Sequence, residues 1–248
     1  MVNLVVDIGN TRTKLAVFNN RELFHYEVID KDIDEKSIVD LIEKFKVNNS
    51  IISSVITQLS GLEDILKSRT NYIRFSASRQ LSVKLTYKTP QTLGLDRLAA
   101  VIAAASIYPN QNCLVIDAGT CITYDAVDSE QTFAGGSISP GIRMRFEAMH
   151  TLTGRLPLVN ADEDFSSWQG DDTISAIRSG VQNGVFHEVM GFIENHYSRF
   201  SNLKILLCGG DAKFFDTRLK NSIFAHAFKT EPHLVLIGLN EVIYQHND

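Results

Sequence analysis

Two segments of the sequence place an aspartate two residues before a glycine at the end of an apolar run. They are "VVDIGNTRTKLAVF", Val5 to Phe18, and "VIDAGTCITYDAV", Val115 to Val127. Asp7 and Asp117 cannot bind phosphate directly, because like charges repel, but each can hold a cation or its water shell that bridges to phosphates. The pair therefore predicts a metal and a nucleotide together; the simpler alternative is that both aspartates only stabilise hairpin turns.

The residues after each aspartate suit phosphate oxygens. Gly9 and Gly119 carry no Cβ, so a ligand can approach the backbone closely. Asn10 and Thr11 in the first turn, and Thr120 in the second, add small polar groups beside exposed amide N–H groups. A single copy would favour a plain turn, whereas two aligned copies facing one cleft favour a ligand site.

A third turn lies in "LLCGGDA", Leu206 to Ala212, where an apolar run enters Gly209-Gly210 and the start of a helix. A flat adenine or a ribose could lie against such a turn, although Gly-Gly turns between strand and helix are common. The sequence contains neither a GxxxxGK[ST] nor a GxGxxG motif. A bound nucleotide would therefore be held by neither the P-loop nor the Rossmann device.

The elements around these turns repeat along the chain. Each hairpin is followed by a further strand and then by alternating helices and strands. Asp7 aligns with Asp117, Thr13 with Thr123 and Ala16 with Ala126 without a gap. The repeat predicts an α/β protein of two duplicated halves, residues 1–112 and 113–248, with a cleft between them and a last helix that can cross back to the first half.

Two helices are expected beside these hairpins. The Ala-rich segment from Gly94 to Tyr108 begins with Asp96 and Arg97, which in isolation resemble a first-turn acid and a surface ion pair. A second helix is expected after Ser139, with that serine as N-cap and Pro140 in the first turn.

The three turns, in this order, resemble the acetate and sugar kinase, Hsp70 and actin superfamily, whose duplicated ribonuclease-H-like domains clasp ATP. Between the repeats, "YKTPQTLGLDRLAA", Tyr87 to Ala100, is similar to the signature of type III pantothenate kinases. Further matches are "SSV" from Ser53, "GGSISPGI" from Gly135 and "GDDTISAIRSG" from Gly170. The resemblance covers nearly the whole chain.

The resemblance implies roles for individual residues. Asp96 would be the general base for the pantothenate hydroxyl, and Arg97 would hold the substrate through the carboxylate of pantothenate, which a guanidinium can bind with two hydrogen bonds. Asp117 would bind a monovalent cation, K⁺ or NH₄⁺. The remaining substrate residues would be Tyr87, Gly94, Leu95 and Thr173, and the ATP and Mg²⁺ residues would be Asp7, Ile8, Gly9, Asn10, Thr11, Lys14 and Thr120. Because Thr173 would reach the partner's substrate, the resemblance also implies a homodimer with shared active sites.

The implied activity is ATP-dependent phosphorylation of pantothenate to 4′-phosphopantothenate, the first step of coenzyme A biosynthesis. Two alternatives stay open: a non-catalytic accessory relative of the same fold, and another small-molecule kinase or ATPase of the superfamily. A protein that has lost catalysis has no physical reason to keep several like-charged carboxylates together, which argues against the accessory relative. Asp172 departs from the family pattern, in which a neutral or basic residue is more usual.

Composition excludes several classes of protein. The 248 residues carry a net charge of -5 and 44% hydrophobic residues, so the chain can bury a real core but offers no basic surface for nucleic acid. Three dispersed cysteines without metal spacing predict buried free thiols. Because the sequence shows no secretory signal and no membrane-spanning run, a cytoplasmic protein is expected.

Overall fold

The fold is described from a computed structural model of the chain, which describes residues 1–9, 12–30, 34–54, 60–200 and 202–247. The chain divides into two compact units. Unit 1 contains Met1–Pro109, Gln131–Phe133 and His233–Asp248, and unit 2 contains Asn110–Glu130 and Ala134–Pro232. The boundary expected between residues 112 and 113, and the cleft between the two halves, stay predictions.

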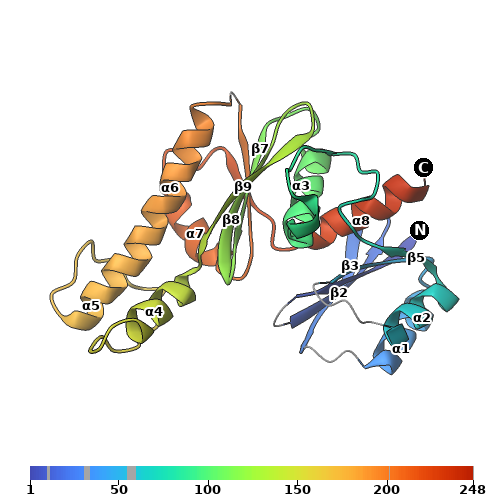
Figure 1. The fold of residues 1–248 in the computed structure, drawn as a ribbon, viewed down its shortest axis with the longest axis horizontal. Helices are drawn as coiled ribbons and strands as arrows, with labels where there is room; N and C mark the ends of the chain where they lie inside the picture. Colours follow the sequence, from blue (N-terminus) through green and yellow to red (C-terminus); the bar gives the residue numbers. More distant parts are fainter. Residues whose placement is uncertain (10–11, 31–33, 55–59, 201, 248) are drawn as a thin grey trace. The chain divides into compact units, whose positions relative to one another are not determined.

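Unit 1 is built on a five-stranded sheet in the order β3-β2-β1-β4-β5 (Figure 1). The first three strands form an antiparallel meander, whereas β4 and β5 run parallel to β1. Helices α1 and α2 cover one face, and α3 and α8 pack on the other. The elements of unit 1 are β1 (Val2–Ile8), β2 (Arg12–Asn19), β3 (Glu22–Asp30), α1 (Glu35–Phe45), β4 (Asn49–Ser54), α2 (Ser60–Arg69), β5 (Asn71–Arg74), β6 (Lys84–Leu85), a 3₁₀ turn (Pro90–Thr92), α3 (Leu95–Ile107) and α8 (Leu234–Asn247).

Unit 2 repeats this plan. Its strands follow the order β11-β10-β7-β8-β9, in which β7 and β8 form the hairpin and β10 and β11 run parallel to β7. The first residues of β9, Thr132 and Phe133, pair instead with β6 in unit 1. The elements are β7 (Cys113–Ala118), β8 (Cys121–Val127), β9 (Thr132–Pro140), α4 (Ile142–Thr151), α5 (Thr173–Arg178), a π-helical turn (Ser179–Asn183), α6 (Gly184–Tyr197), β10 (Lys204–Cys208), α7 (Ala212–Leu219) and β11 (Phe228–Thr230).

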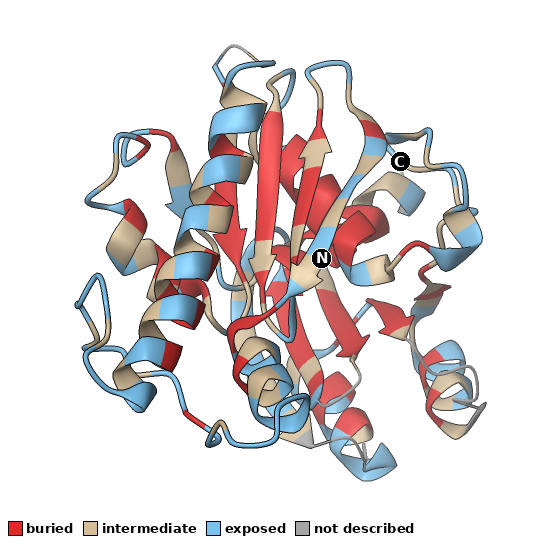
Figure 2. Cartoon of the chain, turned by 60° about the vertical axis from the view of Figure 1, so that its left-hand side comes forward, coloured by how far each residue is buried: buried red, intermediate tan, exposed pale blue. Residues whose placement is uncertain are grey.

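The central strands β1 and β7 consist almost entirely of buried residues, and buried residues run along the strands in Figure 2. From Asn3 to Ile8, every residue of β1 is buried, because helices cover both sides of the sheet. Helix α3 is buried from Arg97 to Ala105, which explains its nearly continuous apolar sequence. The predicted duplicated α/β fold is therefore confirmed, with one meander and two further parallel strands in each half.

The gap-free alignment of the two hairpins is wrong by one residue after the turn. Asp7 lies opposite Lys14, but Asp117 lies opposite Thr123. The glycine N–H donates to the Arg12 carbonyl in the first hairpin and to the Cys121 carbonyl in the second, so the second turn is one residue shorter. Thr123 is consequently the structural counterpart of Lys14 rather than of Thr13.

Two smaller predictions also need correction. Pro140 ends β9 and Gly141 is the N-cap of α4, because the strand pairing continues through the proline. Cys113 and Cys208 are buried and lie in no disulfide, but Cys121 is exposed because it begins β8 beside the turn. Among the described residues, no helix is both long and apolar enough to cross a bilayer.

Candidate active site

Asp7 stands in a row of three side chains at the end of β1. Its Cα partners are Lys14 on β2 and Ser53 on β4. Residues paired across strands project from the same face of a sheet, so the three side chains are neighbours. Asp7 is 9% exposed and Ser53 is 3% exposed. Alternation along β1 turns this row away from the core formed by Leu4, Val6 and Ile8.

The surroundings of Asp7 change its acidity. Burial raises the pKa of Asp7 to about 6, Lys14 opposes this rise, the nearby Asp96 carboxylate adds to it, and a hydrogen bond from Ser53 lowers it. The repulsion between Asp7 and Asp96 means that two carboxylates far apart in the sequence lie within electrostatic reach. A cation bound near Asp7 would lower the electrostatic cost of keeping this buried carboxylate charged.

Asp96 enters the site from the first turn of α3. The helix begins after Gly94, whose position as N-cap offers no side chain, and Asp96 Oδ1 instead accepts a hydrogen bond of 2.8 Å from the Arg97 N–H. Asp96 is exposed, whereas Arg97 is only 7% exposed. The Arg97 guanidinium lies 6.0 Å from the centre of the Tyr87 ring, at the limit of a cation–π contact. An exposed carboxylate beside a fixed guanidinium can meet a hydroxyl on a substrate.

A cavity of about 590 Å³ opens beside this helix start. Gly94 and Leu95 line it on one side. Its other walls are Ser54, Ser76, Ala77, Ser78, Pro90, Gln91 and Leu93. The mixture of small polar and apolar groups suits a small polar molecule with an aliphatic part.

In unit 2, the Gly-Gly turn packs directly on the second hairpin. Gly209 has a φ of +93°, and a Cβ there would overlap the Ala118 carbonyl oxygen and Asp117 Oδ1. The Asp211 N–H donates to the same Ala118 carbonyl over 2.8 Å. The end of β7, which carries Asp117, and the turn at Gly209 therefore pack directly against each other, and only glycine fits at residue 209.

Replacing Gly209 by alanine is expected to destabilise unit 2 by about 1–3 kcal/mol, because the new side chain would be both strained and in contact with the hairpin. Urea unfolding measures the effect. Gly210→Ala is the matched control, since a Cβ at Gly210 meets no atom within 4 Å. Equal midpoints for the two variants would show that the turn is not held as tightly as described.

Thr120 connects the second hairpin to α4. Its carbonyl accepts a hydrogen bond of 3.0 Å from the N–H of Gly141, the N-cap of α4. A cavity of about 520 Å³ lies between the first turns of α4 and α7 and is lined by Arg143, Gly210, Asp211 and Lys213, among others. Burial raises the pKa of Asp211. This hollow beside the Gly-Gly turn can receive a flat ring or a sugar.

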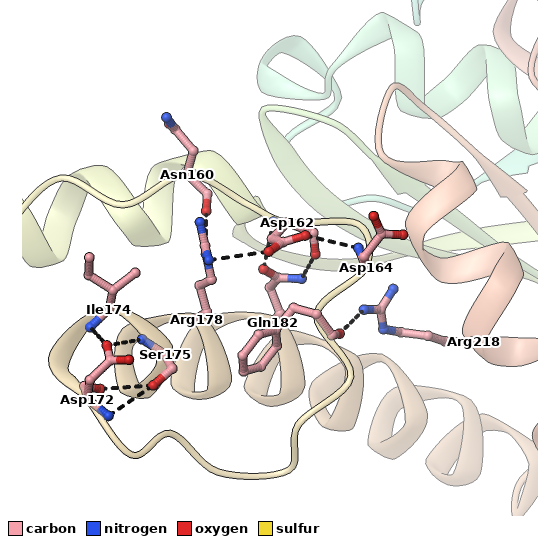
Figure 3. A network of polar contacts seen from close by, with 10 residues as sticks. Asn160, Asp162, Asp164, Asp172, Ile174, Ser175, Arg178, Gln182 and Arg218 are labelled. Carbon is pink, nitrogen blue, oxygen red and sulfur yellow. Dashed lines mark hydrogen bonds and ion pairs between the residues drawn. The ribbon is translucent and has the colours of Figure 1, made fainter.

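Thr173 is exposed at the first position of α5. The unexpected Asp172 is the N-cap of this helix, and its Oδ1 accepts hydrogen bonds from the N–H groups of Ile174 (2.7 Å) and Ser175 (3.0 Å) (Figure 3). An acid here satisfies two free helix N–H groups, which explains why a neutral or basic residue is not needed.

The structure brings Asp7, Lys14 and Asp96 together in unit 1, and Asp117 and the Gly-Gly turn together in unit 2. Asn10 and Thr11 lie outside the described residues. Ser53 and Gly141 contact the predicted residues but were not assigned roles from sequence. Ser53 belongs to a segment whose family resemblance was noted, but only strand pairing shows that it faces Asp7. In the described part of the chain, no three His, Cys, Asp or Glu side chains form a metal cluster by themselves.

Comparison with known proteins decides the family. The family described as type III pantothenate kinase matches residues 3–195. The chain belongs to this family. It is 44% identical over 227 residues to a type III pantothenate kinase from Flavobacterium johnsoniae, covering 90% of this chain and 92% of that one.

Solved structures support the fold of this member of the type III pantothenate kinase family. A Campylobacter jejuni protein described as a Baf family transcriptional activator is 23% identical, covers 98% of both chains and gives a TM-score of 0.60. A glucokinase from an Antarctic psychrotroph is 12% identical, with 100% and 99% coverage and a TM-score of 0.51. At these identities the likeness shows the fold alone, which is the actin-like and sugar kinase fold.

Proposed function

We propose that this chain transfers the γ-phosphoryl group of ATP to the hydroxyl of pantothenate, giving 4′-phosphopantothenate for coenzyme A biosynthesis. The observation that carries the proposal is the match to the type III pantothenate kinase family, together with a buried Asp7 that lies within electrostatic range of the exposed Asp96. One carboxylate is placed to face a cation and the other to face a substrate. Phosphoryl transfer needs little else from the protein than positioning and charge neutralisation.

Asp7 would hold the metal that accompanies ATP. Burial makes the charged form of its carboxylate unfavourable, and a bound divalent cation that prefers oxygen ligands would offset this electrostatic cost, so the residue fits Mg²⁺. When bound, Mg²⁺ bridges phosphate oxygens and neutralises their charge. Lys14 supplies a further positive charge next to Asp7, and Gly9, which carries no side chain, lets phosphates approach the turn.

Asp96 would accept the proton of the pantothenate hydroxyl. Its exposure lets the carboxylate reach the substrate, and the Arg97 N–H fixes its orientation. Arg97 is suited to a bidentate hold on the pantothenate carboxylate, and Tyr87 supports its guanidinium. Gly94 and Leu95 would contact the substrate from the wall of the neighbouring cavity.

Unit 2 would hold the rest of the nucleotide. Thr120 follows Gly119 in the second hairpin and would contact phosphate, while the hollow beside Gly210 would take the adenosine part. Asp117 would bind a monovalent cation, K⁺ or NH₄⁺, close to Gly209. These roles are supported by the way the hairpin and the Gly-Gly turn pack together.

Release of ADP with and without pantothenate, in K⁺ and in Na⁺ buffer, tests this function. Pantothenate-dependent release that is faster in K⁺ is the expected result. Release without pantothenate would indicate an ATPase or a kinase for another acceptor. No release under any condition would indicate an accessory protein that keeps the fold.

The active enzyme is proposed to be a homodimer in which Thr173 reaches the partner's substrate. Large apolar side chains of unit 2 are exposed, among them the neighbour of Thr173: Ile174 is 48% exposed, Trp168 is 80% exposed and Leu152 is 82% exposed. Exposed apolar groups of this size are typical of protein interfaces. Trp168 also has its carbonyl held by Ser179 over 2.9 Å, so its loop is anchored to the helix that follows Thr173.

Thr173→Ala is expected to raise KM for pantothenate with little change in KM for ATP, because the hydroxyl would contact only the acceptor substrate. Ile174→Asp, which places a charge on the exposed apolar neighbour, should give monomers with the same KM defect. Steady-state kinetics and light scattering measure both effects. A monomeric Ile174→Asp variant with unchanged affinity for pantothenate would disprove the shared site.

A further inference from the structure

The two hairpins carry different side chains beside their aspartates. The cross-strand partner of Asp7 is Lys14, and the cross-strand partner of Asp117 is Thr123. Such partners project from the same face with their Cβ atoms about 5 Å apart. A lysine ammonium therefore stands near the first aspartate, where it lowers the pKa of Asp7, and a neutral hydroxyl stands near the second.

The Thr123 hydroxyl has no hydrogen-bond partner within the described parts of the chain, although its Oγ1 is buried. Leaving a buried hydroxyl unpaired is unfavourable, and such groups in native proteins usually mark an absent water, ion or ligand. Thr123 lies on the face of β8 that Asp117 shares, and opposite the face of Ile122 and Tyr124, which belong to the core of unit 2. The unpaired oxygen therefore fits a group bound at Asp117.

The chemistry of the row selects the kind of group. The partner of Asp117 on β10 is Cys208, a soft sulfur, whereas the partner of Asp7 on β4 is Ser53. Large monovalent cations prefer carboxylate, carbonyl and hydroxyl oxygens to sulfur. Among the two side chains that flank Asp117 in the row, Thr123 is the one that offers such an oxygen.

We propose that Thr123 is a ligand of the monovalent cation beside Asp117. The first hairpin has a lysine at the corresponding position, and because threonine carries no charge, Asp117 needs a cation from solution to balance its carboxylate. The proposal rests on the proposed function, in which Asp117 binds this cation. In the first hairpin the chain itself supplies one positive charge, Lys14, besides the Mg²⁺ proposed at Asp7, whereas in the second hairpin the row contains no basic side chain and its positive charge has to come from solution.

Thr123→Val tests the ligand role, because valine keeps the branched shape and removes only the oxygen. The readout is the melting temperature of the protein during KCl titration at constant ionic strength, with NaCl as the reference salt. In the wild type K⁺ should stabilise more than Na⁺, and the variant should need at least about tenfold more K⁺ for the same rise. Thr13→Val is the matched control: Thr13 Oγ1 is also buried and unpaired among the described residues, but it lies on the core face of unit 1, so its K⁺ titration should match the wild type.

Thr123→Lys tests the second part of the proposal by reproducing the row of the first hairpin. Its melting temperature and its ADP release should be the same in K⁺ and Na⁺. A Thr123→Val titration identical to that of the wild type overturns the proposal and leaves the kinase function untouched. A wild type that forms phosphopantothenate but is stabilised equally by both salts overturns the cation site together with this proposal, whereas loss of product formation in the wild type is the separate failure of the proposed function.

Discussion

Asp96→Asn is expected to lower kcat by about 10² or more while ATP binding stays nearly unchanged. An asparagine keeps the shape of the side chain but cannot accept the proton of the pantothenate hydroxyl, and loss of a general base has effects of this size. ATP affinity should survive, because Asp96 is exposed at the helix start rather than within the row that contains Asp7. Single-turnover kinetics and calorimetric titration with a non-hydrolysable ATP analogue measure the two properties separately.

The control for this variant is Glu35→Gln. Glu35 is likewise an exposed acid in the first turn of a helix of unit 1, so its change removes the same favourable interaction with the helix dipole. If both variants lose the same small amount of stability and neither loses kcat, Asp96 is only a helix-stabilising acid. A loss of kcat confined to Asp96→Asn supports its role as the base.

Asp7→Asn is expected to abolish kinase activity and, at neutral pH, to make the ligand-free protein more stable. The folded pKa of about 6 lies above the ordinary 3.8, so the folded state binds the proton more tightly than the unfolded state. Stability therefore falls as the pH rises from about 4 to about 6, and above that range the ionised Asp7 costs about 3 kcal/mol. Asparagine removes this cost, but it also removes the negative charge that would hold Mg²⁺.

Urea unfolding of the ligand-free protein at pH 5 and pH 8 measures this effect. The wild type should lose stability between the two pH values by more than the variant does, so that the gain from Asp7→Asn is larger at pH 8. Asp40→Asn, at an exposed position of α1, should change neither stability nor activity. An Asp7→Asn protein that is less stable than the wild type at pH 8 would mean that Lys14 compensates the burial of this carboxylate fully, contrary to the raised pKa of Asp7.

Much of the fold was predictable because the hydrophobic pattern is strong. The two apolar runs that end at Asp7 and Asp117 could only be central strands, and their repeat predicted the duplicated meanders that the structure contains. Pro140 was misplaced because a Ser-Pro pair is typical of a helix start, whereas here strand β9, which β6 pairs only at Thr132 and Phe133, continues to the proline. A turn signal does not reveal which neighbouring strand will pair across it.

The site was predictable only where motif and chemistry coincide. Asp96 could be assigned from its motif, but its electrostatic contact with Asp7 depends on how α3 packs beside the sheet. Ser53 could not be assigned, because its role follows from parallel pairing between β4 and β1. The role of Thr123 could not be predicted, because the second hairpin turn is one residue shorter than the first. A gap-free sequence alignment therefore matches Lys14 with Tyr124, a core residue, instead of with Thr123. Which side chains lie beside Asp7 and Asp117 depends on pairing between strands far apart in the sequence, and this pairing cannot be inferred from local sequence patterns.

The central claim is that the carboxylates of Asp7 and Asp96 direct the transfer of the γ-phosphoryl group from ATP to pantothenate. The most direct measurement is the amount of phosphorylated pantothenate formed per ADP released, determined by mass spectrometry of the reaction mixture. The account predicts one phosphopantothenate for each ADP in the wild type and neither product above background with Asp7→Asn. ADP that accumulates without phosphopantothenate would contradict it.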